Sequence, residues 1–313
     1  MDKSTKILIA INIILLTILG VLYFVLFSDS KAERVQRQKR TTTAVYTTQT
    51  KELPDAASDR DVLQDMIRFA LGKESPKFAV YLLRPDIENQ PFIFQSRPMR
   101  PASMIKMFVL AKVMQDAKDG KLSLDELITI TADNIVGGAG SIAGEGANAR
   151  VPIRKAAELM IIESDNTATN ILIDRVGMDN INQYLRANGY NDTILNHKMM
   201  LQHGNTNLSS AADLGNLFTK IYNNTCVDEY YDRLMISYLL KQQDRDCFPA
   251  ALPYWNIAHK TGEVDNLYDD GGIFYGAKGD FILVIMDDNY DSRGETIDKM
   301  KRIASQIAND FIY

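Results

Sequence analysis

The stretch PASMIK, residues 101–106, opens the apolar run 107–114 and places Ser103 at the start of a predicted helix, with Lys106 three positions later. Residues i and i+3 share one face of a helix, so we expect the lysine amine beside the serine hydroxyl. A serine hydroxyl is a poor nucleophile unless a neighbouring base takes its proton. A lysine serves as that base when burial and nearby positive charge keep it partly neutral. The stretch therefore predicts Ser103 as a nucleophile and Lys106 as its base.

The Ser-x-x-Lys spacing is weak evidence when it stands alone. A second copy occurs at residues 28–31, in a stretch that does not look like an active site. Ser103 could equally be a helix N-cap, and Lys106 a solvated residue of the first helical turn. The catalytic interpretation therefore depends on what other motifs the chain contains.

Composition limits the class of protein. The 313 residues have room for one large domain or two small ones, and the apolar fraction of 46% and charged fraction of 24% are ordinary for a globular protein. The net charge of -5 gives no basic surface for nucleic acid. The two cysteines and three histidines have no zinc-like spacing. We predict no metal, cofactor or nucleic-acid partner, and Cys226 and Cys247 either pair or remain separate thiols.

The N-terminal region is organised differently from the rest. Residues 7–27 form an apolar run that reaches the roughly twenty residues a membrane-spanning helix needs, and no cleavage site follows it. We predict four parts, which are a tail (1–6), an uncleaved transmembrane signal anchor (7–27), a basic and threonine-rich stalk (28–57) and a catalytic domain (58–313). Two lysines precede the run and five basic residues follow it within residues 31–40. Taken alone, this charge pattern would put the C-terminal domain in the cytoplasm.

The periodicity of apolar residues predicts an α+β domain. Helical patterns cover residues 59–71, 103–119, 209–223, 229–241 and 297–311, with further helical pieces between 124 and 189. Strand patterns cover residues 78–83, 92–95, 255–259, 272–275 and 281–286, of which the first two form a hairpin. This order predicts one antiparallel sheet built from both chain ends, with an all-helical subdomain packed against it.

Two more motifs follow the first in a specific order. The tripeptide SDN at residues 164–166 follows the apolar helix at 156–162, and KTG at residues 260–262 lies on the strand that begins at Trp255. Either tripeptide alone could be a turn or the end of a strand. In the order Ser-x-x-Lys, Ser-Asp-Asn and Lys-Thr-Gly they form the set found in class A β-lactamases and penicillin-binding proteins, with suitable gaps of about sixty and somewhat under a hundred residues.

From about Asp59 onward the chain resembles the serine penicillin-recognising enzymes, class A β-lactamases most closely. The resemblance implies a β-lactamase/transpeptidase-like fold and four catalytic residues. Ser103 would attack a β-lactam or peptidyl D-Ala carbonyl and form an acyl-enzyme, while Lys106 activates it. Ser164 would pass a proton to the leaving nitrogen. Lys260 would hold Lys106 partly neutral and attract the substrate carboxylate.

The same resemblance implies a substrate-binding set. Asn166 would hydrogen-bond the side-chain amide of the substrate, and Thr261 its carboxylate. Gly262 and Glu263 complete the set, and the backbone N–H of Glu263 would join that of Ser103 in an oxyanion hole. By contrast, we assign Asp165 to the structure of its loop and His259 to strand packing.

Two departures from the family pattern affect the expected chemistry. Class A enzymes need a glutamate that activates the deacylating water, but no glutamate occurs between Ser164 and Cys226. In the corresponding segment, residues 193–200, a methionine falls about where the carboxylate should be. The acidic residues that could substitute are Glu145, Asp192 and Asp213. The second departure is at residues 267–270, LYDD, where family members often carry an arginine for the substrate carboxylate.

Three functions stay open at this point. The first is a β-lactamase-type hydrolase with slow or unconventional deacylation, and the second is a penicillin-binding protein that transfers cell-wall acyl groups. The third is a sensor that binds a β-lactam or peptidoglycan without turnover, although a binding module has no need of Lys106 beside Ser103. The partner in each case is a small molecule or stem peptide. Because such substrates lie outside the cell, we expect a single-pass membrane protein with an extracellular domain, despite the flanking charges.

Overall fold

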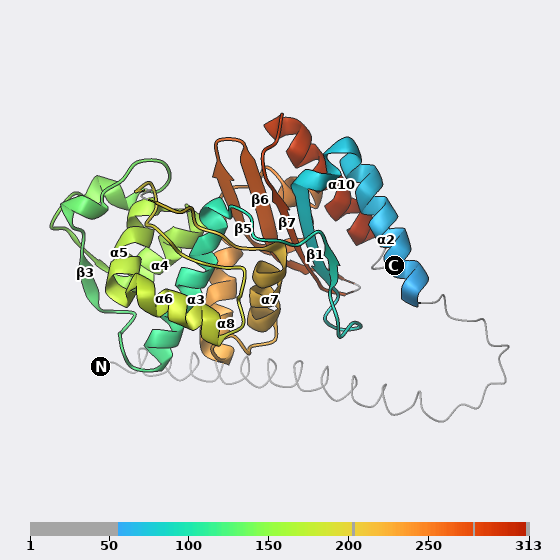
Figure 1. The fold of residues 1–313 in the computed structure, drawn as a ribbon. Helices are drawn as coiled ribbons and strands as arrows, with labels where there is room; N and C mark the ends of the chain where they lie inside the picture. The colour runs from blue at the N-terminus through green and yellow to red at the C-terminus, as the bar shows by residue number, and fades with distance from the viewer. Residues whose placement is uncertain (1–55, 202–203, 278, 311–313) are drawn as a thin grey trace, which may run out of the picture. The chain divides into compact units, whose positions relative to one another are not determined.

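The computed structural model describes residues 56–201, 204–277 and 279–310 (Figure 1). The predicted tail, the transmembrane anchor at 7–27 and the stalk up to residue 55 lie outside this part of the chain. Within the described ranges, no helix has the length and apolar character needed to cross a membrane. The structure therefore tests the predicted catalytic domain.

One five-stranded antiparallel sheet combines the two ends of the domain. Its strand order is β2-β1-β7-β6-β5, and every neighbouring pair is antiparallel. The strands are β1 (Phe78–Leu83), β2 (Phe92–Phe94), β5 (Asn256–Val264), β6 (Leu267–Tyr275) and β7 (Phe281–Asp287). The predicted sheet, its hairpin and its origin in both chain ends are confirmed.

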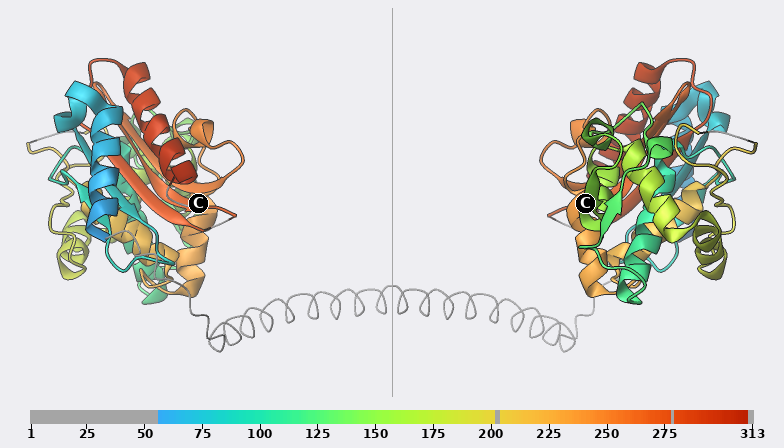
Figure 2. Two further views of the ribbon diagram at one scale, coloured as in Figure 1. Left: turned by 90° about the vertical axis from the view of Figure 1, so that its right-hand side faces the viewer. Right: turned by 90° about the vertical axis from the view of Figure 1, so that its left-hand side faces the viewer.

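Helices cover both faces of this sheet, as Figures 1 and 2 show. On one face α2 (Ala56–Leu71) packs beside α10 (Arg293–Asp310), so the first and last helices of the domain are neighbours. On the other face α7 (Ala211–Tyr222) joins the sheet to the helical subdomain. The remaining helices are α3 (Lys106–Lys118), α4 (Ile153–Ile162), α5 (Asn166–Val176), α6 (Met178–Ala187), α8 (Glu229–Leu239) and the short α9 (Phe248–Ala251).

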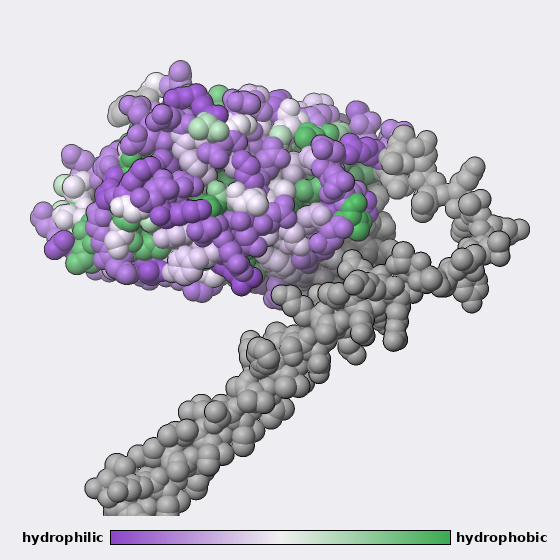
Figure 3. Space-filling view, turned by 90° about the horizontal axis from the view of Figure 1, so that it is seen from below, coloured by the Kyte–Doolittle hydropathy of each residue, from purple (hydrophilic) through white to green (hydrophobic). Residues whose placement is uncertain are grey.

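Apolar side chains gather in two buried clusters, one on each face of the sheet. Strand β1 alternates between them, because successive side chains of a strand point to opposite faces. The molecular face in Figure 3 is mostly hydrophilic, with hydrophobic residues in small groups. Cys226 belongs to one cluster and Cys247 to the other, and both are free. Of the two predicted alternatives, separate thiols are therefore correct.

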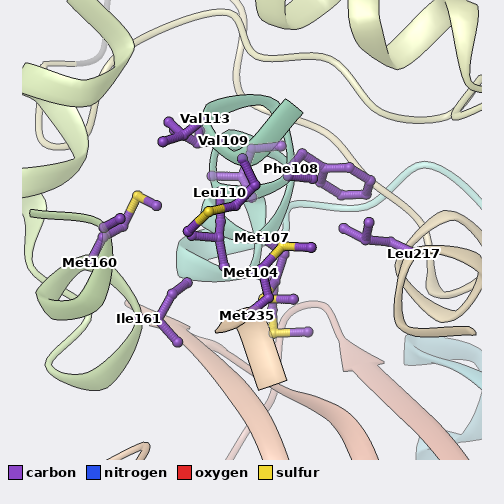
Figure 4. Packing of buried hydrophobic residues seen from close by; sticks show 14 of the residues in the cluster. Met104, Met107, Phe108, Val109, Leu110, Val113, Met160, Ile161, Leu217 and Met235 are labelled. Carbon is purple, nitrogen blue, oxygen red and sulfur yellow. The ribbon is translucent and has the colours of Figure 1, made fainter. Parts of the chain in front are cut away.

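The helix that follows the PASMIK stretch forms the centre of the helical subdomain. Met107 to Met114 are all buried, and Figure 4 shows side chains of α3 among residues from α4, α7 and α8. A helix that is buried nearly all round belongs inside a protein rather than on its surface. Its first residue, Lys106, is therefore carried into the interior with the apolar residues around it.

Two predicted details of the fold are wrong. The middle of the chain is not all-helical, since β3 (Leu127–Thr129) and β4 (Arg150–Pro152) form a small two-stranded sheet. These strands are too short for a period of two to be visible in the sequence. Strand β6 begins at Leu267 rather than at residue 272. The prediction missed its first half because the aspartates and glycines there resemble a turn, although they are buried.

Candidate active site

The three motifs meet around one pocket of about 880 Å³. Ser103 lies on the 3-10 turn η2 (Ala102–Ile105) that leads into α3, and Ser164 lies between α4 and α5. Strand β5, which carries Lys260, is the edge strand beside η2. The predicted residues that line the pocket are Ser103, Ser164, Asn166, Thr261 and Glu263. The two lysines are fully buried and do not line it.

Lys106 is 0% exposed, which excludes the alternative of a solvated first-turn residue. Its Nζ lies 2.5 Å from the carbonyl oxygen of Ser164, 3.1 Å from the Ser164 hydroxyl and 2.8 Å from Oδ1 of Asn166. Burial and the positive charge of Lys260 hold the pKa of Lys106 well below its usual range, against the opposing effect of Asp165. This is the direction that a general base requires.

The three contacts of Lys106 fit a neutral amine. The Ser164 carbonyl oxygen can only accept a hydrogen bond, and so can Oδ1 of Asn166, whose Nδ2 donates to the carbonyl of Gly137 at 3.0 Å. These two acceptors take both N–H groups of a neutral amine. The remaining lone pair then faces the Ser164 hydroxyl, which can donate to it.

Lys260 approaches the same hydroxyl from strand β5. Its Nζ lies 3.1 Å from the Ser164 Oγ and 2.6 Å from the carbonyl oxygen of Thr261. Burial lowers the pKa of Lys260 to about 8, although the charges of Asp244 and Asp270 act in the opposite direction. Lys260 is therefore mostly charged at neutral pH and supplies the positive charge that disfavours a proton on Lys106.

The loop around Ser164 is fixed by its neighbours. Ser164 adopts a positive φ of 56°, a conformation that costs energy for a residue with a side chain. Asp165 caps α5 by accepting from the backbone N–H of Ala168 at 2.7 Å, and its other oxygen accepts from the N–H of Ile142 at 2.7 Å. The structural role predicted for Asp165 is confirmed.

Gly262 allows β5 to approach the turn that carries the nucleophile. A Cβ added at Gly262 would lie 2.7 Å from the carbonyl oxygen of Pro101. The contribution of this glycine is therefore close packing, and it does not line the pocket. Its neighbour Glu263 does, and the side chain of Glu263 is paired with Arg293 at 2.7 and 3.0 Å. The Ser103 side chain makes no hydrogen bond with any residue that the structure describes.

Comparison with known proteins agrees with this geometry. A model of the beta-lactamase enzyme family matches residues 60–311. The chain belongs to this family. No curated protein matches it.

Solved structures of the same fold cover nearly all of the described domain. A beta-lactamase from Sphaerobacter thermophilus has a TM-score of 0.72 at 21% identity and covers 80% of this chain and 98% of its own. PBP-A has a TM-score of 0.71 at 26% identity, and the match covers 79% of this chain and 96% of PBP-A. The TLA-1 extended-spectrum beta-lactamase has a TM-score of 0.74 at 17% identity, and the match covers 81% of this chain and 99% of that protein. Family and fold support a serine hydrolase of the β-lactamase and penicillin-binding type.

In the segment where the family carries its glutamate, the pocket wall is formed by methionines. Met199 and Met200 both line the pocket, and the backbone of Met199 is held on both sides by Asn170. The Asn170 side chain accepts from the Met199 N–H at 2.8 Å and donates to its carbonyl oxygen at 3.1 Å. The position where a carboxylate was expected is thus fixed in place and apolar.

The three acidic residues considered as replacements do not line the pocket. Glu145 is exposed outside it. Asp213 is buried and accepts from the backbone N–H of Asp192 at 2.9 Å and from the Thr193 hydroxyl at 2.8 Å. The alternative in which one of them replaces the missing glutamate therefore has no support in the geometry.

Sequence reasoning missed several other pocket residues. Glu163 and Asp244 line the pocket, as does His197, whose Nδ1 lies 2.8 Å from the carbonyl oxygen of Lys198. Glu163 directly precedes Ser164, outside the segment 193–200 that corresponds to the family's glutamate loop. Arg100 also lines the pocket, and its guanidinium donates to Asp288 at 2.7 Å.

The aspartates of β6 are buried behind the pocket rather than in it. Asp270 is 0% exposed and lies 2.9 Å from Nδ1 of His259, which confirms that His259 is a packed strand residue. Asp269 is equally buried and accepts from the backbone N–H of Asp287 at 2.9 Å. Neither supplies the cation that many family members carry on this strand.

Proposed function

We propose that this chain forms an acyl-enzyme at Ser103 with β-lactams or D-Ala-like amides and hydrolyses it slowly. The observation that carries the proposal is the Ser164 hydroxyl, which lies 3.1 Å from both Lys106 and Lys260 at the edge of a pocket lined by Ser103. A binding module has no need of two buried lysines around one hydroxyl, since burying an amine is costly.

Each group has a defined task in acylation. The Ser103 oxygen attacks the substrate carbonyl, and its proton passes to neutral Lys106, whose lone pair must first turn from the Ser164 hydroxyl toward Ser103. As the carbon–nitrogen bond breaks, Ser164 gives its proton to the leaving nitrogen and receives one from Lys106. The backbone N–H groups of Ser103 and Glu263 stabilise the oxyanion.

Substrate binding uses the neighbouring polar groups. The charge of Lys260 and the hydroxyl of Thr261 attract the carboxylate of the substrate. One hydrogen of the Asn166 amide is bonded to Gly137, and the second is available for a substrate carbonyl. Gly262 keeps the strand close enough to the Ser103 turn for both walls to contact one ligand.

Slow hydrolysis follows from the apolar wall around Met199. Without a carboxylate there, no side chain at that position can take a proton from an attacking water. A solved structure of PBP-A carrying the L158E substitution is described as an acyl-enzyme complex with penicillin G. Covalent acylation by penicillin therefore occurs on this fold in a protein related at 26% identity.

A second candidate is a penicillin-binding protein that transfers the acyl group to a cell-wall acceptor. The same methionine favours it, because an acceptor other than water removes the need for a hydrolytic carboxylate. A sensor that never turns over is the third candidate, and Lys106 beside a pocket serine argues against a purely binding role.

The proposal includes a membrane anchor at residues 7–27 and a catalytic domain outside the cell. It is supported by the apolar run in the sequence and by the extracellular position of peptidoglycan. A topology reporter fused after Tyr313 tests it. Activity only of a reporter that works in the cytoplasm would contradict the location and the cell-wall substrate together.

Intact-mass spectrometry of the full chain in detergent, mixed with a penicillin and followed from minutes to hours, separates the candidates. Slow hydrolysis predicts a stoichiometric adduct that decays as the penicillin is consumed, and Ser103→Ala must remove both signals. An adduct that persists without decay would favour the penicillin-binding or sensor alternatives. Neither adduct nor loss of penicillin would contradict the proposed chemistry.

A further inference from the structure

Glu163 is a half-buried carboxylate in the pocket wall that has no hydrogen bond or ion pair with any residue the structure describes. Of the other pocket carboxylates, Asp265 is exposed to solvent, and the remaining two have partners. Glu263 is paired with Arg293 at 2.7 Å, and Asp244 accepts from the Tyr268 hydroxyl at 3.2 Å. A partly buried carboxylate has lost water without gaining a partner, so a cationic or N–H donor group of a ligand would improve its environment.

The wall around Glu163 is rigidly assembled. Glu163 follows the last residue of α4, and this helix end is joined to the segment after α8 by two hydrogen bonds. Gln242 donates through its side chain to the carbonyl of Ile161 at 2.8 Å, and the backbone N–H of Gln243 donates to the carbonyl of Ile162 at 3.1 Å. These bonds keep Glu163 in a fixed position at the pocket surface.

The charge of this wall is negative. Asp244, the next residue of the joined segment, lines the same pocket as Glu163. Among the described residues, Arg100 is the one arginine or lysine that lines the pocket. Its guanidinium is already paired with Asp288 at 2.7 Å. Lys106 and Lys260 contact the Ser164 hydroxyl but do not line the pocket. An ammonium group on a ligand would therefore meet uncompensated negative charge at Glu163.

Glu163 lies in the pocket wall next to the residue that handles the leaving group. It directly precedes Ser164, the residue proposed to give a proton to the leaving group. Asn166, proposed to hold the acyl side of the substrate, lies beyond Ser164 next to Gly137. We infer that Glu163 is a specificity residue that favours substrates whose leaving group carries an ammonium group. This inference rests on the proposed acyl-enzyme function.

Three thioesters with one common acyl group, D-alanyl in type, test the inference. Their leaving thiols are 2-(trimethylammonio)ethanethiol, 2-methoxyethanethiol and mercaptoacetate, which carry a quaternary ammonium, a neutral ether and a carboxylate and cannot take the acyl group from sulfur. All three give the same acyl-enzyme, and dividing each kcat/KM for thiol release by the rate of the same thioester with hydroxide corrects for leaving-group reactivity. After this correction we expect the ammonium thioester to react roughly three to ten times faster than the neutral one, as for a partly exposed ion pair.

The variants separate charge recognition from a structural effect. Glu163→Gln should bring the corrected ammonium-to-neutral ratio to about one, and added salt should lower this ratio in the wild type. Glu145→Gln, which changes an exposed glutamate outside the pocket, should leave the ratio as it is. Equal wild-type rates, or a ratio that survives in Glu163→Gln, would overturn the inference alone. Absence of any thiol release that depends on Ser103 would overturn the proposed function as well.

Discussion

The amine of Lys106 lies 3.1 Å from the hydroxyl oxygen of Ser164 and 2.5 Å from the carbonyl oxygen of the same residue. In the second contact an N–H of Lys106 donates to a carbonyl oxygen, which can only accept. This bond orients the amine so that its lone pair faces the Ser164 hydroxyl. The proton path from the nucleophile to the leaving group therefore depends on the unusual backbone of Ser164, whose φ is 56°. A substitution can disturb this path through charge, through backbone spacing or through the cap that follows Ser164.

The first prediction concerns charge. Acylation needs neutral Lys106 and charged Lys260, so its rate should rise with pH through the lowered pKa of Lys106 and fall above about pH 8, where Lys260 loses its proton. A positive neighbour lowers the pKa of a lysine, so removing it raises that pKa. Lys260→Met should therefore move the rising limb to higher pH and reduce the rate roughly a hundredfold. Rates of adduct formation across pH check this, and an unmoved rising limb would contradict it.

A second prediction concerns the contact between β5 and the Ser103 turn. Gly262→Ala should reduce acylation strongly, because its Cβ would lie 2.7 Å from the Pro101 carbonyl and push the strand away. Gly144→Ala is the matched control, since nothing lies within 4 Å of a Cβ there. Adduct formation and the melting temperature are measured for both. Equal acylation by the two variants would show that the approach of β5 is not required.

The third prediction concerns deacylation. Met199→Glu should shorten the lifetime of the acyl-enzyme, because it puts a carboxylate on the pocket wall at a position whose backbone Asn170 holds. We expect an acceleration of about tenfold or more. Ile87→Glu is the control, since that side chain is 71% exposed and does not line the pocket. The decay of a preformed penicilloyl adduct is the readout, and equal lifetimes for both variants and the wild type would argue against the assignment of this wall.

A fourth prediction concerns stability. Asp165→Ala removes the cap of α5 and leaves the buried N–H of Ile142 without its partner, so it should lower the free energy of unfolding by about 2–4 kcal/mol. Asp228→Ala removes the cap of α8 and a surface ion pair with Lys118 at 3.6 Å, and it should cost about 1 kcal/mol. Denaturant unfolding of both variants compares them. A cost for Asp165→Ala no larger than that for Asp228→Ala would contradict the double role.

The sequence was sufficient to predict the sheet and the meeting of the motifs, because both depend on local patterns. Buried strands give apolar runs, and the order of Ser103, Ser164 and Lys260 could be compared with a known set. The pocket contacts confirm that these residues come together, whereas their chemical roles remain to be tested.

The parts that sequence reasoning missed depend on tertiary neighbours. The first half of β6 contains aspartates and glycines that favour turns, yet Asp270 has a buried partner in His259, and a Cβ on Gly271 would lie 2.9 Å from the Met104 side chain. Glu163 directly follows the last residue of α4. Nothing in the local sequence shows that this carboxylate faces the pocket or that it has no partner.

The most direct test of the account is to locate the acyl group. Each arginine between Lys77 and Lys106 precedes a proline, so trypsin should release residues 78–106 as one peptide, with Ser96 and Ser103 as its serines. After a brief reaction with penicillin and an acid quench, fragmentation of this peptide should place the added mass on Ser103. Added mass on Ser96, on Ser164 in another peptide, or on no peptide would contradict Ser103 as the nucleophile.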